Sequence, residues 1–155
     1  MPTNTVKLLF LCTGNTCRSQ MAHALSLHWA KNHGLRIAIE SRGIRATNGQ
    51  PTTADAVSVL AKANVPWRGH SQQLCATDLK WADLVWGMTQ QHLDYAQQLG
   101  SNVAVNQQPV YQLLAGSQEL ADPLNCGLMA YEELLQKLQQ LLPSRLQEIQ
   151  NSSEA

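Results

Sequence analysis

The sequence shows no excess of either charge. Its 155 residues include 11 Lys and Arg and 11 Asp and Glu, and no run is rich in Lys or Arg. Proteins that bind nucleic acids or anionic membranes concentrate positive charge on one face. The sequence therefore predicts no nucleic-acid partner and no membrane partner.

Long apolar runs are also absent. The N-terminal run Val6–Leu11 is shorter than the apolar core of a signal peptide and has no basic flank. No segment approaches the roughly 18 apolar residues that cross a bilayer. These absences predict a cytoplasmic protein.

Cysteines are few and widely spaced. The four cysteines form no Cys-x-x-Cys pair, and no Cys/His cluster has zinc-finger spacing: Cys12, Cys17, Cys75 and Cys126. In a reducing compartment they are expected to be free thiols. The sequence thus predicts no metal site, and it predicts that at least one thiol is present for its reactivity.

No internal repeat or linker divides the chain, so residues 1–155 are predicted to form a single domain with a disordered tail at about 151–155. Apolar periodicity predicts alternating strands and helices. The strands are expected at Val6–Leu11, Arg36–Ser41, Asp83–Met88 and near Asn102–Val105. The helices are expected at Arg18–His33, Thr52–Ala63, Gln90–Leu99 and from Leu128 onward, with a kink or restart at Pro143. This order predicts an α/β fold with a parallel sheet, helices on both faces and ligands at the carboxyl ends of the strands.

A Cys-x5-Arg-Ser motif follows the first predicted strand. It reads Cys12-Thr13-Gly14-Asn15-Thr16-Cys17-Arg18-Ser19 and leads into a predicted helix. The backbone N–H groups of such a loop can surround a tetrahedral anion, and the helix N-terminus adds a positive dipole end. We expect Gly14 to supply the turn with positive φ and Arg18 to offer a planar fork to phosphate oxygens. The motif therefore predicts a phosphate-binding loop.

The same loop supplies a nucleophile. A cysteine beside a helix N-terminus and an arginine favours its thiolate form, and Ser19 can donate its hydroxyl to the Cys12 sulfur. Transfer of a phosphoryl group to Cys12 also needs a general acid that protonates the leaving group. The candidate is Asp122, in Ala121-Asp122-Pro123. The alternative for Asp122 is an ordinary helix-initiating Asp-Pro, and the residues alone do not separate the two roles.

Over nearly its whole length the sequence resembles the low-molecular-weight protein tyrosine phosphatase family. The resemblance is carried by residues 10–19, by Glu40-Ser41-Arg42-Gly43, by Ala82-Asp83-Leu84-Val85 with Met88, and by Ala121-Asp122-Pro123. It implies a four-stranded parallel sheet, no metal or organic cofactor, and a phosphorylated protein as substrate. Cys12 would form a cysteinyl-phosphate, Asp122 would protonate the leaving group and then activate water, and inorganic phosphate would be released.

The resemblance also implies supporting roles. Asn15, with Ser41 and His70 behind it, would hold the loop in its strained shape. Cys17 would form a reversible disulfide with Cys12 under oxidation.

The substrate residue stays open between phosphotyrosine and phosphoarginine. The loop looks similar to that of the bacterial protein-arginine phosphatases, with Thr16 where phosphotyrosine enzymes usually carry Ile or Leu. The family usually has an aromatic just after Asp-Pro, whereas Leu124 and Asn125 follow here. A phenol ring would therefore lose stacking partners.

Two other functions are compatible with a Cys-x5-Arg loop. Thioredoxin-coupled arsenate reductases share the loop but need a close pair of further cysteines after the third strand, and Met88–Leu93 contains none. A non-catalytic phosphate- or phosphoprotein-binding module would bind phosphate or vanadate without turnover. The combination of Cys12, Arg18, Ser19 and a candidate acid favours the enzyme.

Overall fold

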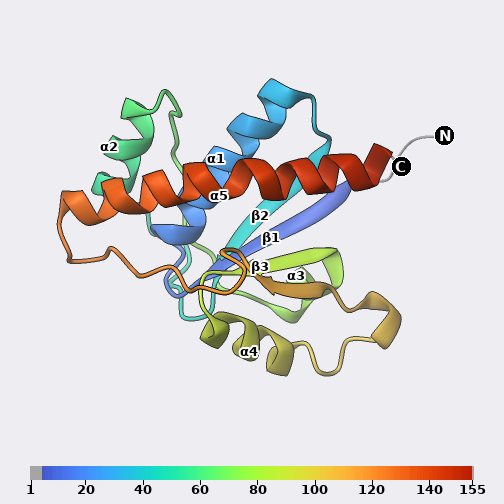
Figure 1. Ribbon diagram of the computed structural model, residues 1–155. Coiled ribbons are helices and arrows are strands. Elements are labelled where there is room, and N and C mark those ends of the chain that lie inside the picture. The colour runs from blue at the N-terminus through green and yellow to red at the C-terminus, as the bar shows by residue number, and fades with distance from the viewer. Residues whose placement is uncertain (1–4, 155) are drawn as a thin grey trace.

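Four parallel strands form one sheet in the structure, a computed structural model that describes residues 5–154 (Figure 1). The strands are β1, Val6–Cys12; β2, Ile37–Gly43; β3, Leu84–Gly87; and β4, Val110–Leu113. Their order across the sheet is β2-β1-β3-β4. The predicted α/β fold with a four-stranded parallel sheet is confirmed.

Helices cover both faces of the sheet. They are α1, Arg18–His33; α2, Ala54–Lys62; α3, Ala76–Trp81; α4, Gln90–Leu99; and α5, Leu128–Glu154, with a short 3-10 helix at Val105–Gln107. Figure 1 shows α1, α2 and α5 on one face and α3 and α4 on the other. The short α3 was not predicted from the sequence.

The central strand β1 is buried on both sides because its apolar residues are nearly continuous. Leu8 and Phe10 join the core under α1, α2 and α5, whereas Leu9 and Leu11 join the core on the α3 and α4 side. All of these side chains are 0% exposed. Burial on both faces fixes the position of β1, and therefore of the loop that follows it.

The fourth strand lies later in the chain than predicted. Residues 102–105 form a turn instead, in which the Val103 N–H binds the carbonyl of Gly100 and the Gln108 amide binds the carbonyls of Gly100 and Val103. These local partners satisfy the backbone that a strand would have paired. The true strand β4 pairs with β3 through Leu84 and Val110. As an edge strand with mixed burial it has a weak apolar pattern.

Helix α5 is longer and more continuous than predicted. It passes through Pro143 and extends to Glu154 without a restart, so it includes most of the predicted tail; Ala155 lies outside the described residues. Leu142 and Leu146 are 2% and 0% exposed, so both sides of the proline are packed on the core. This packing outweighs the missing backbone N–H of proline.

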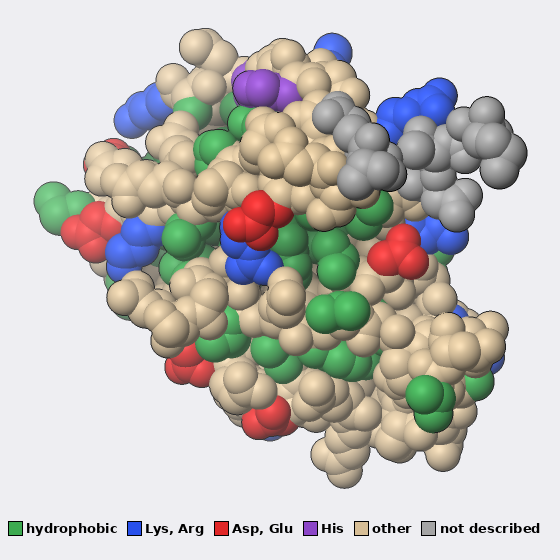
Figure 2. All heavy atoms as spheres, turned by 45° about the vertical axis from the view of Figure 1, so that its right-hand side comes forward, with side chains coloured by type: hydrophobic (Ala, Val, Ile, Leu, Met, Phe, Trp, Pro, Cys, Tyr) green, Lys and Arg blue, Asp and Glu red, His purple; other side chains and the backbone are tan. Residues whose placement is uncertain are grey.

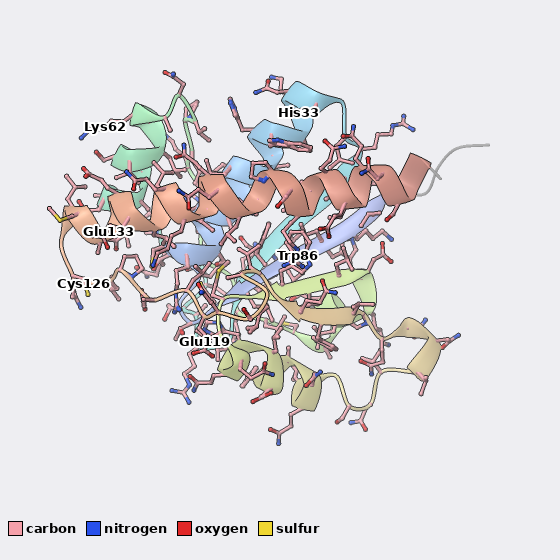
Figure 3. All side chains as sticks on the ribbon, in the orientation of Figure 1. His33, Lys62, Trp86, Glu119, Cys126 and Glu133 are labelled. Atoms are coloured by element: carbon pink, nitrogen blue, oxygen red, sulfur yellow. The ribbon has the colours of Figure 1, made fainter. Side chains whose placement is uncertain are left out.

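Trp86 of β3 is buried between the sheet and α5 (Figure 3). The Arg145 guanidinium lies 4.2 Å from the centre of the Trp86 ring, and Phe10 meets the ring edge-on.

On the face drawn in Figure 2, acidic and basic side chains are interspersed. No helix within residues 5–154 is both long and apolar enough to cross a membrane.

Candidate active site

The Cys-x5-Arg loop joins the carboxyl end of β1 to the first residue of α1. The segment that follows β2 lies against it, because the Ile44 and Arg45 N–H groups donate to the carbonyls of Cys12 and Thr13 at 3.0 and 2.9 Å. Gly43 makes this close approach feasible, since a Cβ there would lie 2.5 Å from the Thr13 carbonyl oxygen. Further along, the Thr53 N–H donates to the Thr16 carbonyl at 2.9 Å. The loop is thus held from two sides.

The residue of the loop with positive φ is Asn15, at 58°, and not Gly14 as predicted. Asparagine tolerates this conformation when hydrogen bonds hold its short side chain. Here the Gln72 N–H donates to Asn15 Oδ1 at 2.9 Å, and Asn15 Nδ2 donates to Ser19 Oγ at 2.7 Å. These bonds compensate for the strain and fix the orientation of the amide.

The Cys12 sulfur lies at the centre of these bonds and is 1% exposed. It is 2.8 Å from Ser19 Oγ and accepts the Asn15 N–H at 3.2 Å. Because the Ser19 oxygen already accepts from Asn15, its hydrogen is free to donate to the sulfur. Both contacts are directed at the sulfur, so they can stabilise the negative charge that it carries when it leaves a covalent intermediate.

Arg18 is buried beside the loop at 4% exposure. Its Nη1 donates to the Leu120 carbonyl at 3.0 Å, and its Nη2 donates to Thr13 Oγ1 at 3.2 Å. Its Nε is buried without a partner among the described residues. A buried guanidinium with an unused donor fits an anion that fills the loop.

Asp122 lies at the same site, although it is 104 positions after Arg18 in the chain. Its Oδ2 is 3.5 Å from Arg18 Nη2, and its side chain is 40% exposed. Its Oδ1 accepts the Leu124 N–H at 3.0 Å and the Cys17 thiol at 3.4 Å. Burial, followed by the nearby Cys12 and Asp122, raises the pKa of Cys17 to about 12, so Cys17 remains a thiol donor.

Comparison with known proteins agrees with this geometry. The model of the low molecular weight phosphotyrosine protein phosphatase family matches residues 7–155. The chain belongs to this family. It is 32% identical to a protein-arginine-phosphatase of Bacillus subtilis, over 87% of this chain and 91% of the relative. It is 31% identical to the low molecular weight protein-tyrosine-phosphatase PtpB of Staphylococcus epidermidis, over 88% and 94%.

A solved structure of the family is also similar. It is a YwlE arginine phosphatase in which a phosphorylated serine replaces the active-site cysteine; it is 26% identical, with a TM-score of 0.87 over 94% of this chain and 96% of its own. The chain is therefore a cysteine-dependent protein phosphatase. This membership supports the phosphatase over the arsenate reductase and the binding module.

Within residues 5–154, neither of the two side chains that the family resemblance places behind Asn15, Ser41 and His70, forms a hydrogen bond to Asn15. The Ser41 hydroxyl is 3.0 Å from His23 Nδ1. The His70 ring is exposed, and it is the His70 backbone carbonyl that accepts a bond, from Gln20 Nε2 at 3.2 Å. The side-chain contacts on Asn15 come from Ser19 and Gln20 instead.

Gln20 and Trp67 are supporting residues that the sequence did not reveal. Gln20 Nε2 donates to the Asn15 carbonyl at 3.1 Å, and Gln20 Oε1 accepts the Trp67 indole N–H at 2.8 Å. The indole orients the amide, and the amide holds the strained residue. Gly69 makes room, because a Cβ there would lie 2.0 Å from Gln20 Oε1. Nothing in their spacing indicates a shared role.

His92 was also missed. It is 1% exposed in the first turn of α4, and its Nε2 lies 3.0 Å from Thr13 Oγ1. Burial, and then the Arg18 charge, lower the pKa of His92 to about 4, so the ring is neutral at neutral pH. The sequence gives no signal of this contact, because Thr13 and His92 are 79 positions apart in the chain.

Proposed function

We propose that this chain hydrolyses phosphoarginine in proteins. The observation that carries the proposal is the composition of the two segments that border the loop. Residues 44–53 bind the loop carbonyls, and residues 120–127 contact Arg18; neither segment contains an aromatic residue. A phenol ring would find no stacking partner there. The Asp122 carboxyl group has two oxygens, so one can accept an N–H of a guanidinium while the other carries the proton for the leaving nitrogen.

The names of the relatives support this choice without deciding it, since both arginine and tyrosine phosphatases are among them. Thr16 adds to it. An aliphatic residue at this place suits the face of a phenol ring, whereas a branched hydroxyl narrows the pocket and can help to place water.

In the first step the Cys12 thiolate attacks phosphorus and forms an S–P bond. The P–N bond of phosphoarginine breaks, its electron pair goes to nitrogen, and Asp122 gives that nitrogen a proton. Arg18 holds the phosphoryl oxygens through Nε and Nη2.

In the second step the Asp122 carboxylate takes a proton from water while the water oxygen bonds to phosphorus. The S–P bond breaks, and the sulfur leaves as a thiolate stabilised by the Ser19 hydroxyl and the Asn15 N–H. Inorganic phosphate departs, and the enzyme returns to its starting state.

The test is hydrolysis of two peptides that differ only in carrying phosphoarginine or phosphotyrosine, with Cys12→Ser as the blank. We expect a kcat/KM at least about tenfold higher for phosphoarginine, and Thr16→Ile is expected to reduce that preference. A preference of the wild type for phosphotyrosine would contradict the proposal. Tight vanadate binding without turnover of either peptide would indicate a binding module.

Asp122→Asn tests the acid. The assay uses a series of aryl phosphates whose leaving groups differ in basicity, because only poor leaving groups need a proton. We expect Asp122→Asn to lower kcat/KM about a hundredfold for poor leaving groups and about tenfold or less for good ones. The measurement is the slope of log kcat/KM against leaving-group pKa. Equal losses across the series would show that another group supplies the proton.

A further inference from the structure

His92 has a defined tautomer. Its Nδ1 is 3.1 Å from the Thr89 N–H, a group that can only donate, so Nδ1 must accept. The hydrogen of the neutral ring is therefore on Nε2, and Nε2 donates to Thr13 Oγ1 at 3.0 Å. The histidine delivers a donor to the loop from the other end of the chain.

That bond determines what the Thr13 hydroxyl can do. Its oxygen receives the Nε2–H of His92 and the Nη2–H of Arg18, at 3.0 and 3.2 Å. A hydroxyl oxygen has two acceptor sites, and both are then in use. The only hydrogen-bonding capacity left to Thr13 is its own hydrogen.

We propose that His92 is a positioning residue of this phosphatase: it makes the Thr13 hydroxyl a donor to the substrate phosphoryl group and steadies Nη2 of Arg18. The inference rests on the proposed function. Without His92, the Thr13 hydroxyl could turn and donate elsewhere. The Thr13 oxygen would then no longer be held at a fixed position relative to the Arg18 guanidinium.

The turn that carries His92 is tightly attached to the site. The Gln90 N–H, at the start of α4, donates to Glu119 Oε2 at 2.7 Å (Figure 3). The Leu120 N–H donates to the Met88 carbonyl at 2.9 Å, while the Leu120 carbonyl accepts from Arg18 Nη1. Arg18 is thus held by this region both through Leu120 and through His92 and Thr13.

A simpler role for His92 is to cap α4, because the same Nδ1 completes the capping box with Thr89. Two substitutions separate the roles. In His92→Asn the amide oxygen reaches the Nδ1 position and keeps the cap, but no donor reaches Thr13. In His92→Gln the amide N–H reaches the Nε2 position and keeps the donor, but the cap is lost.

The experiment compares kcat/KM on p-nitrophenyl phosphate, the calorimetric Kd of inorganic phosphate and the Tm, with exposed His28→Asn as control. We expect His92→Asn to lose at least about tenfold in kcat/KM and in phosphate affinity at a nearly unchanged Tm. His92→Gln should lose less kcat/KM and less phosphate affinity than His92→Asn, and its Tm should fall further. In a protein that already carries Thr13→Val, adding His92→Asn should lower kcat/KM and phosphate affinity only slightly further.

The reverse ranking, with His92→Gln the weaker binder, would show that His92 only caps α4 and would overturn the inference. Full additivity with Thr13→Val, or unchanged phosphate affinity in His92→Asn, would also overturn it. Failure of the wild type to hydrolyse the phosphoarginine peptide would instead refute the proposed function, and the Kd of inorganic phosphate would still test the role of His92 by itself.

Discussion

Replacing Cys12 with serine is expected to lower kcat/KM by at least about a hundredfold while the protein still folds and binds phosphate. A serine hydroxyl fits the same space but stays protonated at neutral pH, so the donors from Ser19 and Asn15 have no anion to stabilise. The measurement is steady-state hydrolysis, together with acid-quenched mass spectrometry of the wild type for a phosphate adduct on Cys12.

Cys75→Ser is the matched control, because Cys75 is an exposed thiol outside the loop. It should keep the wild-type rate. Turnover by Cys12→Ser close to the wild-type rate would remove Cys12 from the mechanism. So would a phosphate adduct located on another cysteine.

Arg18→Lys is expected to lose at least about a hundredfold in kcat/KM, although lysine keeps the positive charge. The guanidinium binds the Leu120 carbonyl and Thr13 Oγ1 and still has a buried Nε without a partner among the described residues. An ammonium cannot keep those bonds and also present a planar fork to two phosphoryl oxygens. The Kd of phosphate should rise together with the loss of rate.

The exposed Arg36 offers a control, since Arg36→Lys makes the same chemical change away from the site. Thermal unfolding of Arg18→Lys separates lost catalysis from lost folding. A folded Arg18→Lys within tenfold of the wild type would mean that charge alone suffices and that the fork has no special role.

Features set by neighbouring residues could be predicted from the sequence. Helix α1 begins and ends where its apolar spacing and Gly34 predict, and Gly34 adopts the left-handed conformation that ends the helix. The nearly unbroken apolar run of β1 identified the central strand, and the loop after it identified the phosphate site. In each case the determining interactions are local or depend only on burial.

The tertiary structure decided the features that depend on distant contacts. Asn15 rather than Gly14 takes the left-handed conformation because the Gln72 N–H supports its side chain. The edge strand lies at β4 because pairing with β3 outweighs a weak local pattern. His92 reaches Thr13 only because the turns after β1 and β3 meet at one end of the sheet. The sequence determined which loop would bind phosphate; its partners came from strand order and packing, which bring distant residues within hydrogen-bond range.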